Sequence, residues 1–273
     1  MSNAVTLTLR APIERVIEAE SVVPDLFATL GNREIAELPV WDGRQRLTLG
    51  DLFQVQGERA STVRVEGDVS LVDALGAAMT AGELTVEGNV GRYAGSRMKG
   101  GVLRVLGNAG YGAGLEMEGG LLDIFGDAGD RVGAARLGES KGMLGGEIIV
   151  HGRVGAEAGS RMRRGTIVCA AAGQRAGEAM IAGNVIVLGD AGEDVGRNNK
   201  RGTILVLGGV SIPPTYRYDC TYRPPHVALT LTHLRARHAL SIDDTYITGR
   251  YRRHSGDLAE LGKGEILEWT MQA

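Results

Sequence analysis

The stretch Gly82-Glu-Leu-Thr-Val-Glu-Gly88 and its copy Gly101-Val-Leu-Arg-Val-Leu-Gly107, which follows 19 residues later, decide the fold. A glycine anchor, five residues of strand character and a glycine-rich turn recur along the chain, with anchors at Gly82, Gly101, Gly120, Gly146, Gly165, Gly183 and Gly202. A looser copy begins at Ser61 and a weaker one occupies residues 47–56, which makes about eight units. A fixed period of this length is typical of a repeat architecture.

Each unit carries apolar residues two and four positions after its anchor. The pairs are Leu84/Val86, Leu103/Val105, Leu122/Ile124, Ile148/Val150, Ile167/Cys169, Val185/Val187 and Ile204/Val206. A period of two points both side chains to one face of a strand. Because one 19-residue unit cannot bury that face alone, equivalent strands must stack, about 4.8 Å apart, into a continuous core. The sequence therefore predicts an all-β, single-stranded parallel β-helix.

The residues beside the strands support this register. Three positions before an anchor stand Met79, Met98, Met117, Met143, Met162 and Met180, with Asn199 in the seventh case. We interpret these methionines as core filling rather than metal ligands, because no Cys or His joins the series. The glycines after each strand, beside Asp68, Asn89, Asn108, Asp127 and Asp190, are expected to adopt left-handed angles at corners. Cys169 is expected to be a buried, unreactive thiol.

The two flanks are expected to cap the repeat, since open strand edges would promote polymerisation. Residues 1–60 are predicted to form an N-terminal α/β cap and entry coil, with a strand at 5–9 and a short helix at 22–30. Residues 61–209 form the repeat, and residues 210–273 a C-terminal cap or interaction segment. A seven-residue insertion around Gly138–Gly142 is either a tolerated surface loop or a place for a partner to bind.

Composition excludes several classes of protein. The chain is 43% hydrophobic, which is enough for a core, and its net charge of −3 provides no general field for nucleic acid. The charged first 20 residues and the lack of any run of 18 apolar residues argue against a signal peptide and a membrane span. We therefore expect a cytoplasmic location, without nucleic acid or membrane partners. Cys169 and Cys220 lie too far apart for a CxxC site, and no disulfide is expected.

The sequence offers no recognisable catalytic set. His151 is the only histidine of the repeat, and no paired carboxylates stack near it. The tail contains His226, His233, His238 and His254 with Cys220, but their spacing matches no zinc template. We therefore predict no catalytic residue and no metal ligand in this chain.

Two arginine groups remain as candidate contacts for an anionic group. Arg161, Arg163 and Arg164 stack with Arg197, Lys200 and Arg201 on one corner, which is either a solvated face or a surface for an acidic partner. Arg250, Arg252 and Arg253 lie on a predicted strand of the tail, where they serve either a structural contact or anion binding. Arg97 and Lys99 are expected to form ion pairs with Glu116 and Glu118 of the next unit.

One motif carries a family resemblance. The pattern Gly-x-x-x-Gly-x-x-Met-x-x-Gly in residues 91–101, 110–120 and 155–165 resembles the glycine-repeat β-helix of glutamate synthase large subunits. It is more similar to the C subunit of formylmethanofuran dehydrogenase, as are Leu49-Gly-Asp-Leu-Phe53, Ser255-Gly-Asp257 and Gly262-Lys-Gly-Glu265. The resemblance covers nearly the whole chain and, with the crossover rule for parallel strands, implies a right-handed coil.

This family has two branches, and both stay open. One is the archaeal tungsten or molybdenum dehydrogenase, and the other is the formyltransferase/hydrolase complex of methylotrophic bacteria. The 26 Arg against 4 Lys suggest a GC-rich genome and favour the bacterial branch.

The resemblance to the bacterial branch implies a non-catalytic scaffold in one-carbon metabolism. Its partners would be the hydrolase (A), B and formyltransferase (D) subunits. These would move a formyl group from tetrahydromethanopterin to methanofuran or methylofuran and hydrolyse it to formate, so the cofactors and the hydrolase metal would belong to the partners. The anionic glutamyl tail of such a carrier makes Arg250, Arg252, Arg253, Arg161, Arg163 and Arg164 candidate tail contacts.

Overall fold

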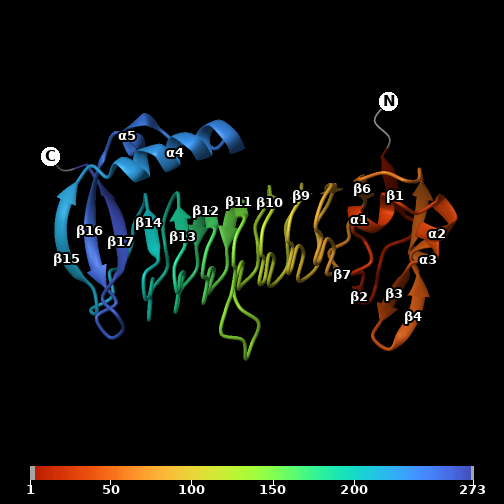
Figure 1. Cartoon of the computed structure of the whole chain (residues 1–273), viewed down its shortest axis with the longest axis horizontal. Coiled ribbons are helices and arrows are strands. Elements are labelled where there is room, and N and C mark those ends of the chain that lie inside the picture. Colours follow the sequence, from red (N-terminus) through yellow and green to blue (C-terminus); the bar gives the residue numbers. More distant parts are fainter. Residues whose placement is uncertain (1–3, 272–273) are drawn as a thin grey trace.

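The computed structural model describes residues 4–271, and the chain in it is mainly β. Thirteen strands lie side by side along the long axis as one largely parallel sheet (Figure 1). In sheet order they are β15 (Arg217–Tyr222), β16 (Arg250–Gly256), β17 (Gly264–Thr270), β14 (Thr203–Val206), β13 (Asn184–Val187), β12 (Thr166–Ala172), β11 (Glu147–Val154), β10 (Leu121–Ile124), β9 (Val102–Val105), β8 (Glu83–Val86), β6 (Thr62–Glu66), β1 (Val5–Leu9) and β5 (Phe53–Gln56).

A second sheet lies at the N-terminal end, and the described residues form five helices, which lie near the two ends of the chain. The four strands are β4 (Gln45–Thr48), β3 (Pro39–Asp42), β2 (Ile17–Glu18) and β7 (Val72–Asp73). The helices are α1 (Pro24–Phe27), α2 (Asn32–Ala36), α3 (Leu49–Leu52), α4 (Pro225–His238) and α5 (Asp244–Ile247). None of the helices within residues 4–271 has the length and apolar character needed to cross a membrane.

The predicted register of the repeat is confirmed. Strands β6 and β8 to β14 pair in parallel, and Leu84, Leu103 and Leu122 stand directly opposite one another on successive strands. The same alignment continues through Ile148 to Ile204. A second line of parallel bridges, from Val69 through Val90 and Ala109 to Ala191, joins the repeats away from these strands.

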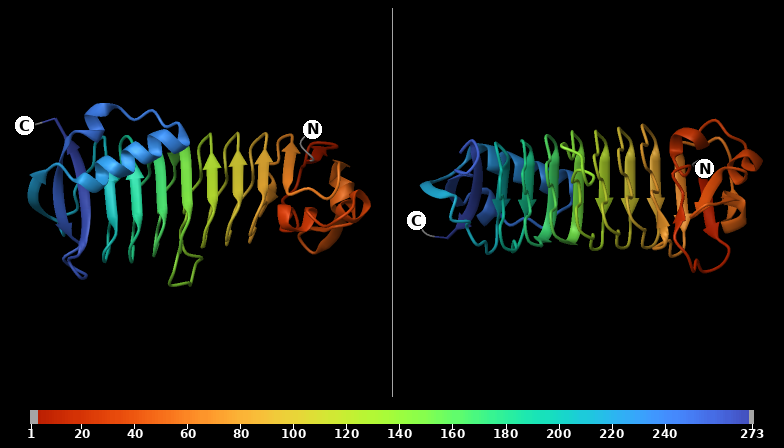
Figure 2. Two further views of the ribbon diagram at one scale, coloured as in Figure 1. Left: turned by 45° about the horizontal axis from the view of Figure 1, so that its top comes forward. Right: turned by 90° about the horizontal axis from the view of Figure 1, so that it is seen from below.

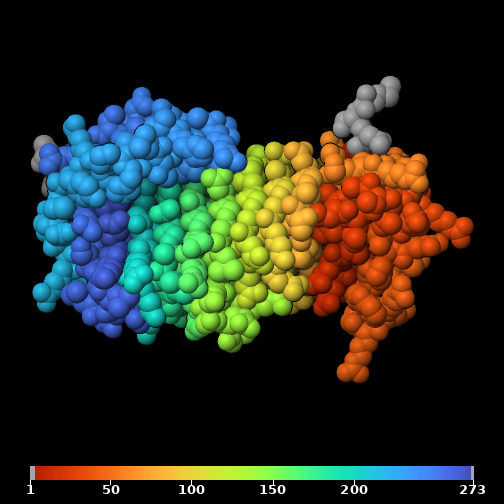
Figure 3. All heavy atoms as spheres, in the orientation of Figure 1, coloured from red at the N-terminus to blue at the C-terminus, as the bar shows by residue number. Residues whose placement is uncertain are grey.

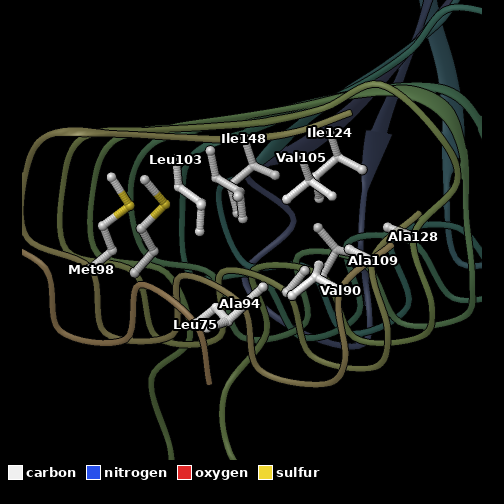
Figure 4. Packing of buried hydrophobic residues seen from close by; sticks show 14 of the residues in the cluster. Leu75, Val90, Ala94, Met98, Leu103, Val105, Ala109, Ile124, Ala128 and Ile148 are labelled. Carbon is white, nitrogen blue, oxygen red and sulfur yellow. The ribbon is translucent and has the colours of Figure 1, made fainter. Parts of the chain in front are cut away.

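The inner side chains form one continuous core along the repeat. All six repeat methionines are fully buried, and Figure 4 shows Met98, Leu103 and Val105 pointing inside the winding chain toward Val90 and Ala94. Asn199 ends the methionine series. It is also fully buried, and its amide exchanges two hydrogen bonds with the backbone of Gly202, at 2.9 and 2.7 Å. A polar group can occupy this place because both of its ends are hydrogen-bonded.

The glycines play two different roles, and one expectation about them is wrong. Every anchor except Gly202 has the left-handed conformation, as at Gly101 with φ 76°. Of the glycines after a strand, Gly67 has the expected positive φ, but Gly107 and its equivalents in the later repeats do not. A Cβ on Gly107 would lie 2.7 Å from the carbonyl oxygen of Gly88 in the neighbouring repeat. The backbones of neighbouring repeats therefore lie too close together at Gly107 for any residue with a Cβ. The adjacent Asn89 also links repeats, because its Oδ1 accepts a hydrogen bond from the backbone N–H of Asn108 at 2.8 Å.

The N-terminal segment departs from the prediction in two places. The strand at residues 5–9 is confirmed, but the helix expected at 22–30 is helical only at Pro24–Phe27. Ser21 does not cap this helix, because its hydroxyl donates to the carbonyl oxygen of Pro39 at 2.8 Å. Residues 47–56 are not a repeat unit, since they contain the end of β4, α3 and β5, and β5 runs antiparallel to β1.

Helix α4 was not expected from the sequence. It lies across the outer face of β11 to β14, while the strands nearer the N-terminus stay bare (Figure 2, left). Its residues Val227, Leu231 and Leu234 pack on the outward-facing Val168 and Ile186, forming a second core separate from the one inside. The apolar spacing of these helix residues behind Pro224-Pro225 is the sequence signal that indicates such a helix.

Candidate functional site

The first arginine group meets the insertion loop. The loop between β10 and β11 projects from the side of the molecule (Figure 1). Arg161 donates from Nη1 to the carbonyl oxygen of Glu139 at 3.0 Å, which ties the loop to this corner. Arg163 and Arg164 are exposed and, with Lys141 and Leu144, surround a hollow of about 240 Å³. We call this hollow the basic corner; none of its three cations forms an ion pair with a described residue.

The second arginine group does not form one site. Directly opposed residues of an antiparallel pair share a face, and Arg253 lies opposite the buried Leu267, whereas Arg252 lies opposite Glu268. Arg253 contacts two carboxylates, with Nε 2.8 Å from Glu265 and Nη1 3.1 Å from Asp219. The anionic groups of the chain itself therefore already occupy Arg253.

Arg250 borders a cleft at the C-terminal end that neither Arg252 nor Arg253 borders. This cleft, of about 710 Å³, is bordered by Arg223 and Arg250 and by the rings of Tyr246 and Trp269. The two rings meet edge to face with centroids 4.8 Å apart, and Trp269 Nε1 donates to the carbonyl oxygen of Thr245 at 3.3 Å. We call it the end cleft. Sequence reasoning missed Arg223, because only the tertiary fold places it beside Arg250.

A groove also lies between the N-terminal segment and the insertion loop. It measures about 350 Å³ and is bordered by Glu20, Tyr93, Tyr111 and Arg136 among others. The ion pairs here differ from the expected ones. Arg97 contacts Glu20 at 3.5 Å, and Glu116 contacts Arg136 of the insertion loop at 3.5 Å. The N-terminal segment and the loop thus supply the charges that were expected from adjacent repeats.

Two histidine contacts lie on the outer face of the sheet. His151 Nε2 is 3.0 Å from Asp123 Oδ1, and its ring stacks on Phe125 with centroids 4.6 Å apart. At the end of α4, the buried His238 lies 3.4 Å from Glu147. Within residues 4–271, no three His, Cys, Asp or Glu side chains converge as metal ligands.

The two thiols differ in burial. Cys169 is fully buried in the inner core, and burial raises the pKa of its thiol to about 12. Cys220 is partly exposed on β15. Because the thiolate is the reactive form, Cys169 is inert in the folded chain.

Comparison with known proteins gives matches along the whole length. The chain is 43% identical over 261 residues to the C subunit of the formyltransferase/hydrolase complex Fhc of Methylorubrum extorquens, covering 96% of this chain and 98% of that protein. It is 40% identical over 99 residues to the C subunit of the tungsten-containing formylmethanofuran dehydrogenase 2 of Methanothermobacter thermautotrophicus, covering 34% and 37% of the two chains. No family model matches the chain.

The fold has a counterpart among solved structures. A chain in the crystal structure of the formyltransferase/hydrolase complex FhcABCD from Methylorubrum extorquens, in complex with methylofuran, superposes with a TM-score of 0.90 and 34% identity. The match covers 96% of this chain and 98% of that one.

Proposed function

The chain belongs to the family of C subunits of formyltransferase/hydrolase complexes, and on this premise we propose that it is the structural C subunit of such a complex. The partners are the hydrolase (A), B and formyltransferase (D) subunits. The assembly moves a formyl group from formyl-tetrahydromethanopterin to methanofuran or methylofuran and hydrolyses it to formate. The observation that carries the proposal is the full-length likeness, in sequence and in fold, to a chain of that complex. The dehydrogenase alternative is weaker, because those relatives match about a third of the chain.

The described residues suit a structural role. Equivalent side chains stack in register over successive repeats, so the core runs unbroken along the long axis. The buried pairs of the repeat contain no titratable group other than the Cys169 thiol. The proposal accordingly assigns the chemical steps, the hydrolase metal and the carriers to the partner subunits, and supposes a cytoplasmic location.

We further infer that the repeat winds as a right-handed β-helix with one full strand in each coil. One pairing line runs through the named strands, and a weaker line of isolated bridges runs through the turns that follow them. In this interpretation residues 1–60 and 210–273 close the two ends of the helix formed by residues 61–209.

Binding of the anionic carrier tail is a second candidate function, and the basic corner supports it best. Arg163, Arg164 and Lys141 leave their charges unpaired by described residues around one hollow. Arg161 is engaged by the insertion loop, and Arg253 by two carboxylates. Arg250 also lacks an ion pair with a described residue, but it donates to the carbonyl oxygen of Thr221, and no second candidate arginine borders its cleft. Of the six candidate arginines, only Arg163 and Arg164 border one hollow together, and we expect these two to matter most.

A tagged chain purified gently from its own host tests the structural role. We expect the A, B and D subunits to co-purify by mass spectrometry, and the sample to release formate from formyl-tetrahydromethanopterin when methylofuran is added. The isolated chain should release none. Formate release by the isolated chain, or recovery of a tungsten or molybdenum oxidoreductase, would overturn the proposal.

The tail-binding function is tested in the assembled complex. Replacing Arg163 and Arg164 by Glu should raise the KM for the carrier at least tenfold, because two cations become anions facing an anionic tail. Arg44→Glu, an exposed cation in the β3–β4 turn, is the matched control. An unchanged KM in a fully assembled double variant would exclude the basic corner as the tail site.

A further inference from the structure

The two ends of the 13-stranded sheet are closed differently. At the N-terminal end, α2 packs on β5, and Asn32 Nδ2 donates to the carbonyl oxygens of Val55 and Gly57 at 3.0 and 3.1 Å. At the other end β15 is the last strand, and no described strand lies beyond it (Figures 1 and 2). Its residues Arg217, Tyr218 and Asp219 are exposed. An open strand edge is a template on which another chain can add a strand.

Unpaired cations border this open edge. Arg217 begins β15, Arg223 follows its last residue, and Arg250 shares the end cleft with Arg223. None of the three forms an ion pair with a described residue, in contrast to Arg253 in the same sheet. Arg250 reaches β15 itself, since its Nη2 donates to the carbonyl oxygen of Thr221 at 3.2 Å. Its Nε is buried and has no hydrogen-bond partner among the described residues.

We propose that β15 and the end cleft together bind an extended, acidic segment of a partner subunit. The segment adds a strand to β15, and its carboxylates meet Arg217, Arg223 and Arg250. Main-chain hydrogen bonds supply affinity in this mode of binding, and the charged pairs set position and specificity. The rings of Tyr246 and Trp269 give the cleft an apolar wall for the same segment. This inference rests on the proposed function, because it requires a hetero-oligomer.

The charges favour such a partner over a second copy of this chain. If two β15 strands paired antiparallel about a two-fold axis, Arg217 of one copy would lie near residues 222–223 of the other. With the axis at residue 220, Arg217 would face Arg223, and with the axis one half-step earlier these two cations would be diagonal neighbours; like charges on opposed positions destabilise a strand pair. An acidic segment instead meets a complementary charge at both ends of β15.

Cys220 provides a probe at this edge. It lies in the middle of β15, and the only other cysteine, Cys169, is buried and inert. We would compare the rate of Cys220 alkylation by iodoacetamide, and amide hydrogen exchange in β15, between the free chain and the assembled complex. Both rates should fall at least tenfold on assembly. Equal exchange in the two states would overturn the inference even though the complex had formed.

Two sets of variants identify the occupant. Replacing Arg217 and Arg223 by Glu should weaken association with the partner subunits at least tenfold, whereas Arg44→Glu should leave it unchanged. A photo-crosslinking p-benzoylphenylalanine at Tyr218, which is 60% exposed, should crosslink to an acidic partner segment, and the same probe at Leu229 on α4 should not.

The outcomes separate the two proposals. A crosslink from position 218 to a second copy of this chain, or to a segment without acidic residues, would show that the inference is wrong. Failure of the wild-type chain to recover any partner subunit would overturn the proposed function, and the inference with it.

Discussion

The outer face of the long sheet changes character halfway along the molecule. In the N-terminal half, the outward-facing residues at the middle of successive strands are Arg64, Thr85, Arg104 and Asp123; in the C-terminal half they are Ile149, Val168, Ile186, Leu205 and Leu267. Arg64, Thr85 and Arg104 are exposed or half-buried, and Asp123 is covered beside His151. The second set lies beneath α4, which forms a ridge over that half only (Figure 3). The inner face shows no such change.

This difference shows that the inner and the outer positions of each repeat strand specify separate features of the structure. The inner positions hold the repeats together, and the outer positions decide whether a further layer is added. Burying a large aliphatic side chain contributes about 1.5–3 kcal/mol, so a row of outer aliphatics strongly favours a covering helix. Glu147 marks the limit of this layer, where His238 and Arg237 of α4 approach its carboxylate at 3.4 and 3.8 Å.

The largest expected effect comes from a charge introduced beneath the helix. Ile186→Asp should lower the free energy of unfolding by about 4 kcal/mol, because it leaves an unpaired charge under α4. Thr85→Asp at the equivalent outer position lies between Arg64 and Arg104, and should change stability by no more than about 0.5 kcal/mol. Urea unfolding followed by circular dichroism measures both. Equal losses of unfolding free energy in the two variants would mean that the outer face is no more buried at Ile186 than at Thr85.

The next effect comes from truncating the helix itself. Leu231 is fully buried against the outer face, so Leu231→Ala should cost about 3 kcal/mol by leaving a cavity. Leu229 on the same helix is 73% exposed, and Leu229→Ala should cost less than about 0.5 kcal/mol. The same urea titrations, with hydrogen exchange of the α4 amides, would detect the difference. A Leu231→Ala variant as stable as the wild type would show that α4 is not held by this core.

The smallest effect is expected on the uncovered half. Arg104 Nη1 lies 3.8 Å from Glu83 Oε2, and both side chains are well exposed. Arg104→Ala should therefore cost about 0.5 kcal/mol or less, and the difference should shrink further in 0.5 M NaCl, a chosen condition that screens surface charges. Thermal unfolding at low and high salt provides the measurement. A loss above about 1 kcal/mol, independent of salt, would indicate that Arg104 has a structural role beyond this pair.

The repeat could be predicted closely because its information is local and repeated. Anchors such as Gly101, alternating pairs such as Leu103/Val105 and the methionine series each recur at the spacing that the strands display. The ends were predicted less well, because they occur only once and no second copy supports an interpretation. The helix expected at residues 22–30 is only four residues long, and the hydroxyl of Ser21 donates to Pro39 rather than capping it.

The candidate contacts show the same limit. The arginine groups were visible in the sequence, but alternation along β16 separates Arg253 from Arg252, and the fold places Arg250 and Arg223 at the border of one cleft. The outer row was visible too, as unbroken apolar runs such as Ile148-Ile149-Val150, a pattern typical of strands buried on both faces.

By itself the sequence determined the repeat, its register and its inner core, because a 19-residue period with alternating apolar residues has one way to bury them all. Only the tertiary structure decided which charges remain unpaired, where α4 lies and which sheet edge stays open. Those features depend on residues that are distant in the chain, such as Arg223 and Arg250, which border one cleft, or Glu147 and His238, which are in contact, and no local pattern encodes that they come together.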